Sequence, residues 1–304
     1  INSKVDEKGN FQNLYLQWGD AKVAIFKKGN DLTHPIFEPI LDDQLVSPDH
    51  IKKIEEKIQK WFEETYLSKL DLSDQLKKFN SKPEERSFIF KIIENQYNFY
   101  QINILDEFKL IDEPQRKEIH SLNFRLGKNV IFNSELIRPE YMKLKFHLWN
   151  LYYNESLNID EYIPKDGNAT LNIQNKLNED LITFLGFVSQ NDLLIRLDIF
   201  NEFEKQLFKR ENRGPFSLPM DLSNLLGIKK DKLISILKSR SFNIQDIAEN
   251  DLVISKKIKA NKTMELKQNN SKKVLKKPLK KVKKSTPKKL FNNPFDQLKN
   301  INAK

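Results

Sequence analysis

The hydrophobic positions between Ile111 and Trp149 predict two helices joined by an extended segment. Apolar residues recur at intervals of three and four, which places each series on one face of a helix. The first series is Ile119, Leu122 and Leu126, and the second is Tyr141, Leu144, Leu148 and Trp149. We expect Asp112 to cap the first helix and Gly127 to end it, because glycine adopts a positive φ at little cost. Residues 128–132 are short and rich in β-formers, and Pro139 suits the first turn of the next helix.

Two kinds of element are predicted upstream of this stretch. Residues 14–26 alternate apolar and polar positions around Trp18-Gly19-Asp20, which indicates a β-hairpin. Prolines at 35, 39 and 48 then indicate an extended connection. Ser47-Pro48-Asp49 predicts the start of one helix, and a capping box of Ser81 and Glu84 predicts the start of another.

The downstream half begins with a predicted joint over 162–168, which contains Pro164 and Asp166-Gly167. Helices are predicted from 172 to 185 and from Asp198 onward, with a short strand at 193–195 between them. Residues 221–237 then have the pattern of a helix-turn-helix, in which Gly227 ends the first helix and Asp231 caps the second.

These elements predict a mainly α fold. We expect a β-hairpin with a proline-rich connection over 1–46 and a helical domain over 47–160. A helix-turn-helix-like subdomain over 161–254 and a disordered lysine-rich tail over 255–304 with a short terminal motif would complete the chain.

The net charge of +10 is concentrated in the tail. Residues 256–289 hold 15 lysines and one acid, whereas residues 1–255 hold 35 basic and 40 acidic residues. Proline and repeated like charge prevent this tail from burying a core, so we expect a mobile polycation that binds phosphates. A tail that only increases solubility is the alternative.

Several classes of site lack sequence support. The chain has no cysteine, which excludes disulfides and thiolate chemistry, and its four histidines do not have metal-ligand spacing. Ile104-Leu105-Asp106-Glu107 resembles a magnesium-binding segment of ATPases, but none of the eight glycines lies in a phosphate loop. We expect no catalytic, cofactor or metal site in this chain. No apolar run is long enough to span a membrane and no signal peptide is evident, so we expect a cytoplasmic protein without membrane contact.

The order of motifs resembles the region that follows the motor domains in bacterial relatives of the mitochondrial degradosome RNA helicase, a superfamily 2 ATP-dependent helicase. The matching positions are Asp112, Arg116, Arg125-x-Gly127, Val130 to Phe132, Leu136-Ile137-Arg138-Pro139 and Leu148-Trp149. Leu126 stands where the family has Phe, and Ile137-Arg138 where it has Leu-Lys. Met220 and Leu225 to Gly227 match a later block, whereas Ser241-Phe242-Asn243 departs from the family's Gly-Tyr-Arg. The ending Asn293 to Leu298 is similar to a terminal Ser-Pro-Phe-x-x-Leu.

This resemblance implies an RNA-engaging accessory region that guides the unwound strand. Motor domains are then expected before Ile1 or in a partner chain, and these would bind ATP and magnesium. The present chain should be inactive alone as an ATPase. The resemblance implies RNA or single-stranded DNA as a partner, and a ribonuclease as a further one.

The residues predicted to contact nucleic acid are basic and lie in three groups. The central block contributes Arg125, Lys128 and Arg138. For Lys143 and Lys145 of the same block, contact with nucleic acid and a solvated helix surface both fit the sequence. The helix-turn-helix contributes Lys229, Lys230, Lys232, Lys238 and Arg240. The tail contributes Lys272, Lys273, Lys276, Lys277, Lys280, Lys281, Lys283, Lys284, Lys288 and Lys289. The helix-turn-helix is equally compatible with a packed helix pair that binds nothing.

Two other functions fit the same sequence. One is a stand-alone nucleic-acid-binding protein whose basic tail grips phosphates without a motor. The other is a protein-interaction scaffold in which the slightly acidic body is the functional surface and the tail is an anchor.

Overall fold

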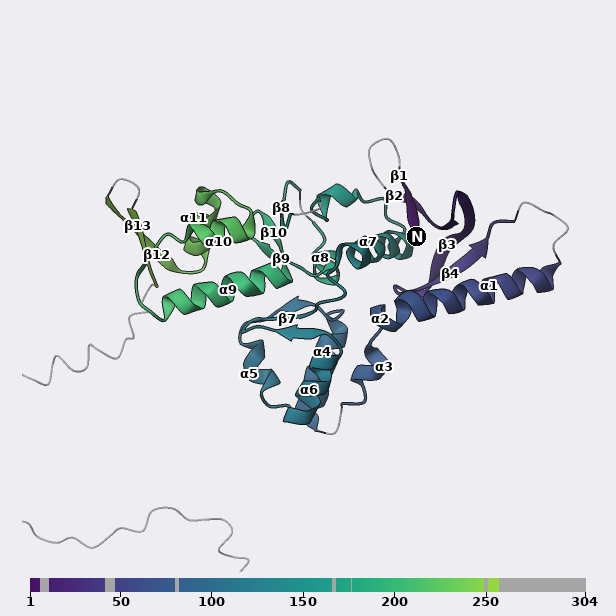
Figure 1. Ribbon diagram of the computed structural model, residues 1–304, viewed down its shortest axis with the longest axis horizontal. Coiled ribbons are helices and arrows are strands. Elements are labelled where there is room, and N and C mark those ends of the chain that lie inside the picture. The colour runs from purple at the N-terminus through teal and green to yellow at the C-terminus, as the bar shows by residue number, and fades with distance from the viewer. Residues whose placement is uncertain are drawn as a thin grey trace, which may run out of the picture. The chain divides into compact units, whose positions relative to one another are not determined.

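The computed structural model describes residues 1–5, 11–41, 47–79, 82–165, 168–175, 177–248 and 251–256 (Figure 1). All of them belong to one compact unit, Ile1–Lys257. The predicted tail beyond Lys256 lies outside the described residues, and with it the ten tail lysines predicted to contact nucleic acid and the terminal motif.

The N-terminal part is a four-stranded antiparallel sheet with the order β1-β2-β3-β4. Its strands are β1 (Asn2–Val5), β2 (Phe11–Trp18), β3 (Ala21–Asp31) and β4 (His34–Pro39). The predicted hairpin is confirmed as β2–β3, and Gly19 in its turn has a φ of 57°. The proline-containing connection is extended as predicted, but it forms edge strand β4, where proline's missing N–H is tolerated.

Helical segments follow the sheet, and the first of them begins at the predicted Pro48. They are α1 (Pro48–Phe62), the π-helical turn η1 (Glu63–Leu67), α2 (Ser68–Leu70), α3 (Ser73–Leu76) and α4 (Pro83–Glu94). Ser47 occupies the N-cap position of α1 as predicted. The cap of α4 is displaced by one residue from the prediction, because Glu85 rather than Glu84 accepts a hydrogen bond from the Lys82 backbone N–H, at 3.0 Å.

The central block differs from its predicted helix–linker–helix form. It contains β5 (Phe99–Tyr100), α5 (Ile104–Phe108), α6 (Glu113–Ser121), β6 (Phe124–Leu126) and β7 (Val130–Asn133), with sheet order β5-β7-β6. Helix α6 ends before Leu122, and Asn123 turns the chain with a φ of 68°. The prediction that Gly127 ends this helix is wrong, because Leu126 belongs to a strand that pairs with Ile131.

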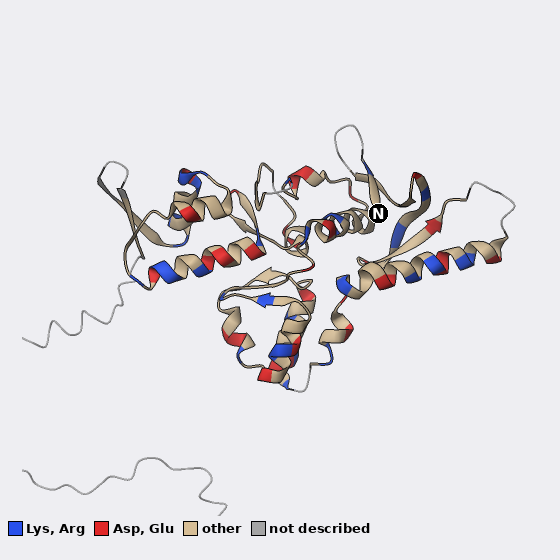
Figure 2. Ribbon diagram, viewed as in Figure 1, with Lys and Arg blue, Asp and Glu red and all other residues tan. Residues whose placement is uncertain are grey.

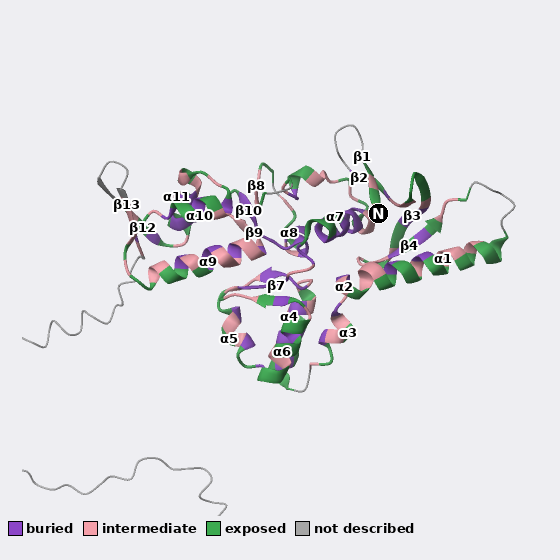
Figure 3. Ribbon diagram, in the orientation of Figure 1, coloured by how far each residue is buried: buried purple, intermediate pink, exposed green. Residues whose placement is uncertain are grey.

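Helix α7 (Pro139–Tyr153) is confirmed and is the most buried helix of the block (Figure 3). The short 3-10 helix η2 (Ile159–Glu161), β8 (Thr170–Asn172), α8 (Glu179–Leu185), β9 (Phe187–Gln190) and β10 (Leu193–Arg196) follow. The predicted helix from 172 begins only after Asn178, whose side chain accepts from the backbone N–H groups of Asp180 and Leu181. The segment before it pairs as β8 with β10.

The distal part consists of α9 (Leu197–Glu211), β11 (Phe216–Ser217), α10 (Met220–Leu226), α11 (Lys230–Ser239), β12 (Phe242–Ala248) and β13 (Asp251–Lys256). The three strands form a sheet of order β11-β13-β12. The sequence predicted the helices but not this sheet. Helices α10 and α11 form the helix-turn-helix, and the β12–β13 hairpin follows it. Strand β11, between α9 and α10, pairs with β13 of this hairpin. This is the topology of a winged helix.

The predicted mainly α class is therefore wrong. Helices make up 47% and strands 25% of the structure, and the strands form four small antiparallel sheets. Many of these strands are two to four residues long, too short for the alternation of apolar and polar residues to reveal them.

Three hydrophobic clusters hold the unit together. One joins the N-terminal sheet to α1, α4 and α7, and another packs α7 against α8 and Tyr162. The third places Val130, Phe132 and Ile137 against α9, α10 and α11. The central block and the distal helices therefore share a core, which positions the site described next. Within the described residues, no helix has the length and apolar character needed to cross a bilayer.

Candidate nucleic-acid interface

The helix-turn-helix predicted from the sequence is present. Helix α10 ends at Gly227, which has a φ of 63°, and the chain turns through Ile228 and Lys229 into α11. The apolar face of α11 is buried through Leu233, Ile236 and Leu237. Asp231 lies in the first turn of α11 rather than capping it, because Lys229 occupies the N-cap position.

The neighbouring β8–β10–β9 sheet holds the turn and the first half of α11. Lys232 Nζ lies 2.7 Å from Asp192 Oδ2 and also donates to the Asn172 side chain. The Asn191 amide donates to Ser235 Oγ at 3.0 Å, and Thr170 Oγ1 donates to the Leu226 carbonyl at 2.9 Å. A recognition helix reads DNA with residues near its N-terminus. In α11 that region is already bonded to the adjacent sheet.

The predicted lysines of the helix-turn-helix therefore differ in availability. Lys229 and Lys238 are exposed and Lys230 is half-buried, and none of the three has an ion-pair partner in the described part of the chain. Lys232 is paired with Asp192, and this contact lowers the pKa of the Asp192 carboxyl. Three of these four lysines remain open to a phosphate.

A groove of about 1130 Å³ lies beside this subdomain. One wall comes from β5, α5 and the β6–β7 turn, and the other comes from α9 and the segment that joins α11 to β12. The groove brings Lys128 and Arg240 together, although they are far apart in the sequence. The other predicted basic residues do not line it.

The floor of the groove contains a buried polar cluster around Glu204. This carboxylate is 7% exposed and forms an ion pair with Arg240. Its two oxygens also accept from Asn129 Nδ2, each at 3.1 Å. Asn129 Oδ1 accepts in turn from the Asn103 backbone N–H at 2.9 Å, so the cluster links both walls of the groove.

Aromatic rings complete this cluster. The Arg240 guanidinium lies 5.3 Å from the centroid of Phe200, and Tyr100 packs edge-on against the same ring at 5.6 Å. Burial, followed by the nearby Glu204 carboxylate, raises the pKa of Tyr100. Arg240 therefore has a structural role in addition to its place on the groove, which the sequence did not reveal.

The rim of the groove is more open than its floor. Phe208 is 43% exposed, and Lys128 Nζ lies 4.6 Å from the centroid of its ring. Lys209 is also exposed on the same helix, α9. Lys128 and Lys209 have no ion-pair partner among the residues that the structure describes. Figure 2 shows that α9 carries both basic and acidic residues along its length.

The other basic residues of the central block lie elsewhere. Arg125 and Arg138 are exposed, and the Arg125 guanidinium donates to the backbone carbonyls of His120 and Phe124. Lys145 is 1% exposed and donates to the Phe184 carbonyl. Burial lowers the pKa of Lys145 to about 7. A nucleic acid cannot reach this buried side chain, so Lys145 is excluded as a nucleic-acid contact in this structure.

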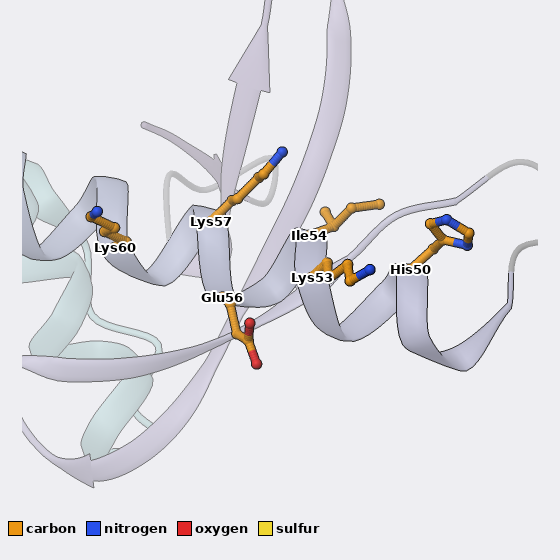
Figure 4. A pocket seen from close by; sticks show the side chains of 6 residues that line it. All are labelled: His50, Lys53, Ile54, Glu56, Lys57 and Lys60. Atoms are coloured by element: carbon orange, nitrogen blue, oxygen red, sulfur yellow. The ribbon is translucent and has the colours of Figure 1, made fainter.

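A second hollow, of about 420 Å³, follows the surface of α1 (Figure 4). It is lined by His50, Lys53, Ile54, Glu56, Lys57 and Lys60. All six residues come from one helix, and Glu56 and Lys57 point in opposite directions in Figure 4. We interpret this hollow as a solvated helix surface. Among the described residues, no group of three or more His, Asp or Glu side chains is arranged to hold a metal ion.

The comparison of this chain with protein-family models, with curated proteins and with solved structures gives no match. The candidate interface is therefore defined by its geometry alone. Sequence reasoning missed Phe208, Asn129 and Glu204 as parts of it. A signal existed for Phe208, because it lies at the edge of the face formed by Phe200, Phe203 and Leu207 and is aromatic where a polar residue is expected. Asn129 and Glu204 had no such signal.

Proposed function

We propose that this chain is a nucleic-acid-engaging accessory region of an ATP-dependent helicase, whose motor domains are supplied by another part of the polypeptide or by a partner chain. The observation that carries the proposal is the groove, which combines exposed lysines with an exposed aromatic ring next to a helix-turn-helix. Phosphates are bound by Lys and Arg, and unpaired bases by aromatic rings.

The sequence supports the same function from a separate direction. The order of the central block, the helix-turn-helix and the lysine-rich tail resembles the helicase family described above. The sequence lacks a phosphate loop, so the role of this chain is to hold the strand while a motor elsewhere hydrolyses ATP. ATP and magnesium are then cofactors of that motor.

A stand-alone nucleic-acid-binding protein is the second candidate. The groove and the basic tail favour it equally, because neither requires a motor to bind a strand. The two candidates differ in what accompanies the chain. A reading frame that continues upstream of Ile1 and encodes a phosphate loop and a DExH box would support the helicase, and the lack of such a frame or of a partner motor would favour the stand-alone protein.

Binding is tested by fluorescence anisotropy with a fluorescein-labelled single-stranded RNA of ten nucleotides at low salt. We expect saturable binding that weakens as salt is added. A parallel assay of ATP hydrolysis should show no turnover above a mock preparation, with or without RNA. An absence of binding at low salt to this RNA and to a single-stranded DNA of the same length would reject both nucleic-acid functions, and measurable ATP turnover would contradict the accessory role.

A further inference from the structure

The groove offers two chemically different surfaces within one site. Its rim presents the exposed ring of Phe208, and Ile102 on the opposite wall is 68% exposed. Lys128 lies beside the ring, and Lys209, Gln190 and Asn201 line the same groove. Rings and apolar side chains bind base faces, ammonium groups bind phosphates, and amides bind base edges.

The charge of the groove suits an anionic strand. Five basic side chains and three acidic ones line it, although residues 1–255 as a whole carry more acids than bases. Asp106 is neutralised by Lys109 at 3.0 Å, and Glu204 by Arg240. Among the described residues, Lys128 and Lys209 have no such ion-pair partner. The groove as a whole therefore has more basic than acidic side chains.

A double helix fits this surface poorly. The usual docking element of a helix-turn-helix is the N-terminal part of its second helix. In this chain Lys232 and Ser235 of α11 are bonded to Asp192 and Asn191 of the β9–β10 turn. In a duplex the faces of the bases are covered by their neighbours, whereas an unpaired base can place its face on a ring.

We propose that the groove binds an unpaired strand of nucleic acid and that one base of that strand stacks on Phe208. This proposal rests on the proposed function and specifies its binding surface. Lys128 Nζ lies over the Phe208 ring, 4.6 Å from its centroid, in the unbound protein. When a base stacks on the ring, it displaces the Lys128 ammonium group, which then binds the phosphate next to that base.

The experiment uses the full chain and three labelled probes, a U10 RNA, a T10 DNA and a ten-base-pair RNA duplex. Binding is measured by anisotropy at several salt concentrations for the wild type, Phe208→Ala and Lys128→Gln. Phe90→Ala and Lys52→Gln are the matched controls. Phe90 is a 57% exposed phenylalanine of α4 and Lys52 an exposed lysine of α1, and neither lines the groove. Circular dichroism verifies that each variant is folded.

We expect Phe208→Ala to weaken binding of the single strands by about tenfold or more, which corresponds to the loss of one base–aromatic contact. The slope of log Kd against log salt should not change, because stacking releases no counterions. Lys128→Gln should instead reduce the magnitude of that slope by about 0.7, the contribution of one phosphate contact to a single strand. Both controls should bind within about twofold of the wild type, a margin small beside one base–aromatic contact.

The RNA and DNA probes distinguish the two sources of a single strand. A larger effect of Phe208→Ala on U10 would assign the groove to RNA, and a larger effect on T10 would assign it to DNA. The stacking proposal is wrong if Phe208→Ala binds both single strands as Phe90→Ala does, or if the wild type prefers the duplex. Binding by the wild type in that case would still support the proposed function, whereas no binding to any probe would reject both.

Discussion

Glu204 on α9 and Arg240 at the end of α11 form a buried ion pair that fixes the floor of the groove. The carboxylate also holds Asn129 of the opposite wall through two hydrogen bonds. Three segments that are distant in the sequence therefore meet at one side chain. The separation of the two walls depends on this contact.

Removing the cation from this pair should destabilise the fold. In Arg240→Met the Glu204 carboxylate stays buried without its counter-charge, and such losses cost about 3 kcal/mol or more. Urea denaturation should show this decrease in the free energy of unfolding. The double variant Glu204→Leu/Arg240→Met should recover part of it, because no buried charge is then left unpaired. An unchanged stability in Arg240→Met would show that the pair is only a surface contact.

Lys145 gives the protein a stability that increases with pH. Burial lowers the pKa of this amine from 10.5 to about 7 in the folded chain. Between these two values the unfolded chain binds a proton that the folded chain does not. The free energy of unfolding therefore rises with pH above about 7, by at most about 1.4 kcal/mol per pH unit from this group.

The variant Lys145→Met isolates that effect, because methionine has a similar length and no charge. Urea denaturation at pH 7, 8 and 9 should give a smaller rise for Lys145→Met than for the wild type, and the variant should be the more stable protein at pH 7. Lys52→Gln, at an exposed position of α1, serves as the control and should follow the wild type. Equal pH dependence in all three proteins would show that Lys145 remains protonated in the fold.

Two glycines of the N-terminal sheet should respond differently to alanine. A Cβ on Gly29 would lie 1.7 Å from the backbone oxygen of His34, so the β3–β4 pair must separate. A Cβ on Gly19 would have no heavy atom within 4 Å, so the only strain there comes from the positive φ of +57°. We expect Gly29→Ala to lower the unfolding free energy by about 3 kcal/mol and Gly19→Ala by about 1 kcal/mol. Thermal unfolding tests this order, and a larger loss in Gly19→Ala would contradict the close approach at Gly29.

The lysine-rich tail should supply most of the salt-dependent affinity for nucleic acid. If about six of its lysines meet phosphates together, log K should fall against log salt with a slope of roughly −4 for a single strand. Deletion of residues 258–304 should remove most of this slope while leaving the compact unit intact. Anisotropy titrations of U10 RNA with both chains provide the measurement. Equal slopes would place the grip in the body and leave the tail with a solubilising or docking role.

The sequence alone determined the elements whose signals are local. Pro139 and the spacing of Tyr141, Leu144 and Leu148 predicted α7 correctly, because a cap and a helical period involve only neighbouring residues. The β2–β3 hairpin and the α10–Gly227–α11 turn were predicted for the same reason. The lysine-rich composition of the tail is likewise a property of the sequence itself, and its predicted role stays a prediction.

Tertiary structure decided what depends on contacts between distant residues. Leu126 fits a helical period with Ile119, yet it lies in β6 because its strand pairs with β7, and this choice changes the fold class. Glu204 appears in the sequence as one acid among 42, and only folding places it against Asn129, 75 residues earlier, and Arg240, 36 residues later. Strand pairing and buried ion pairs depend on segments that the core brings together. The spacing of residues along the chain does not show which of these distant segments will meet.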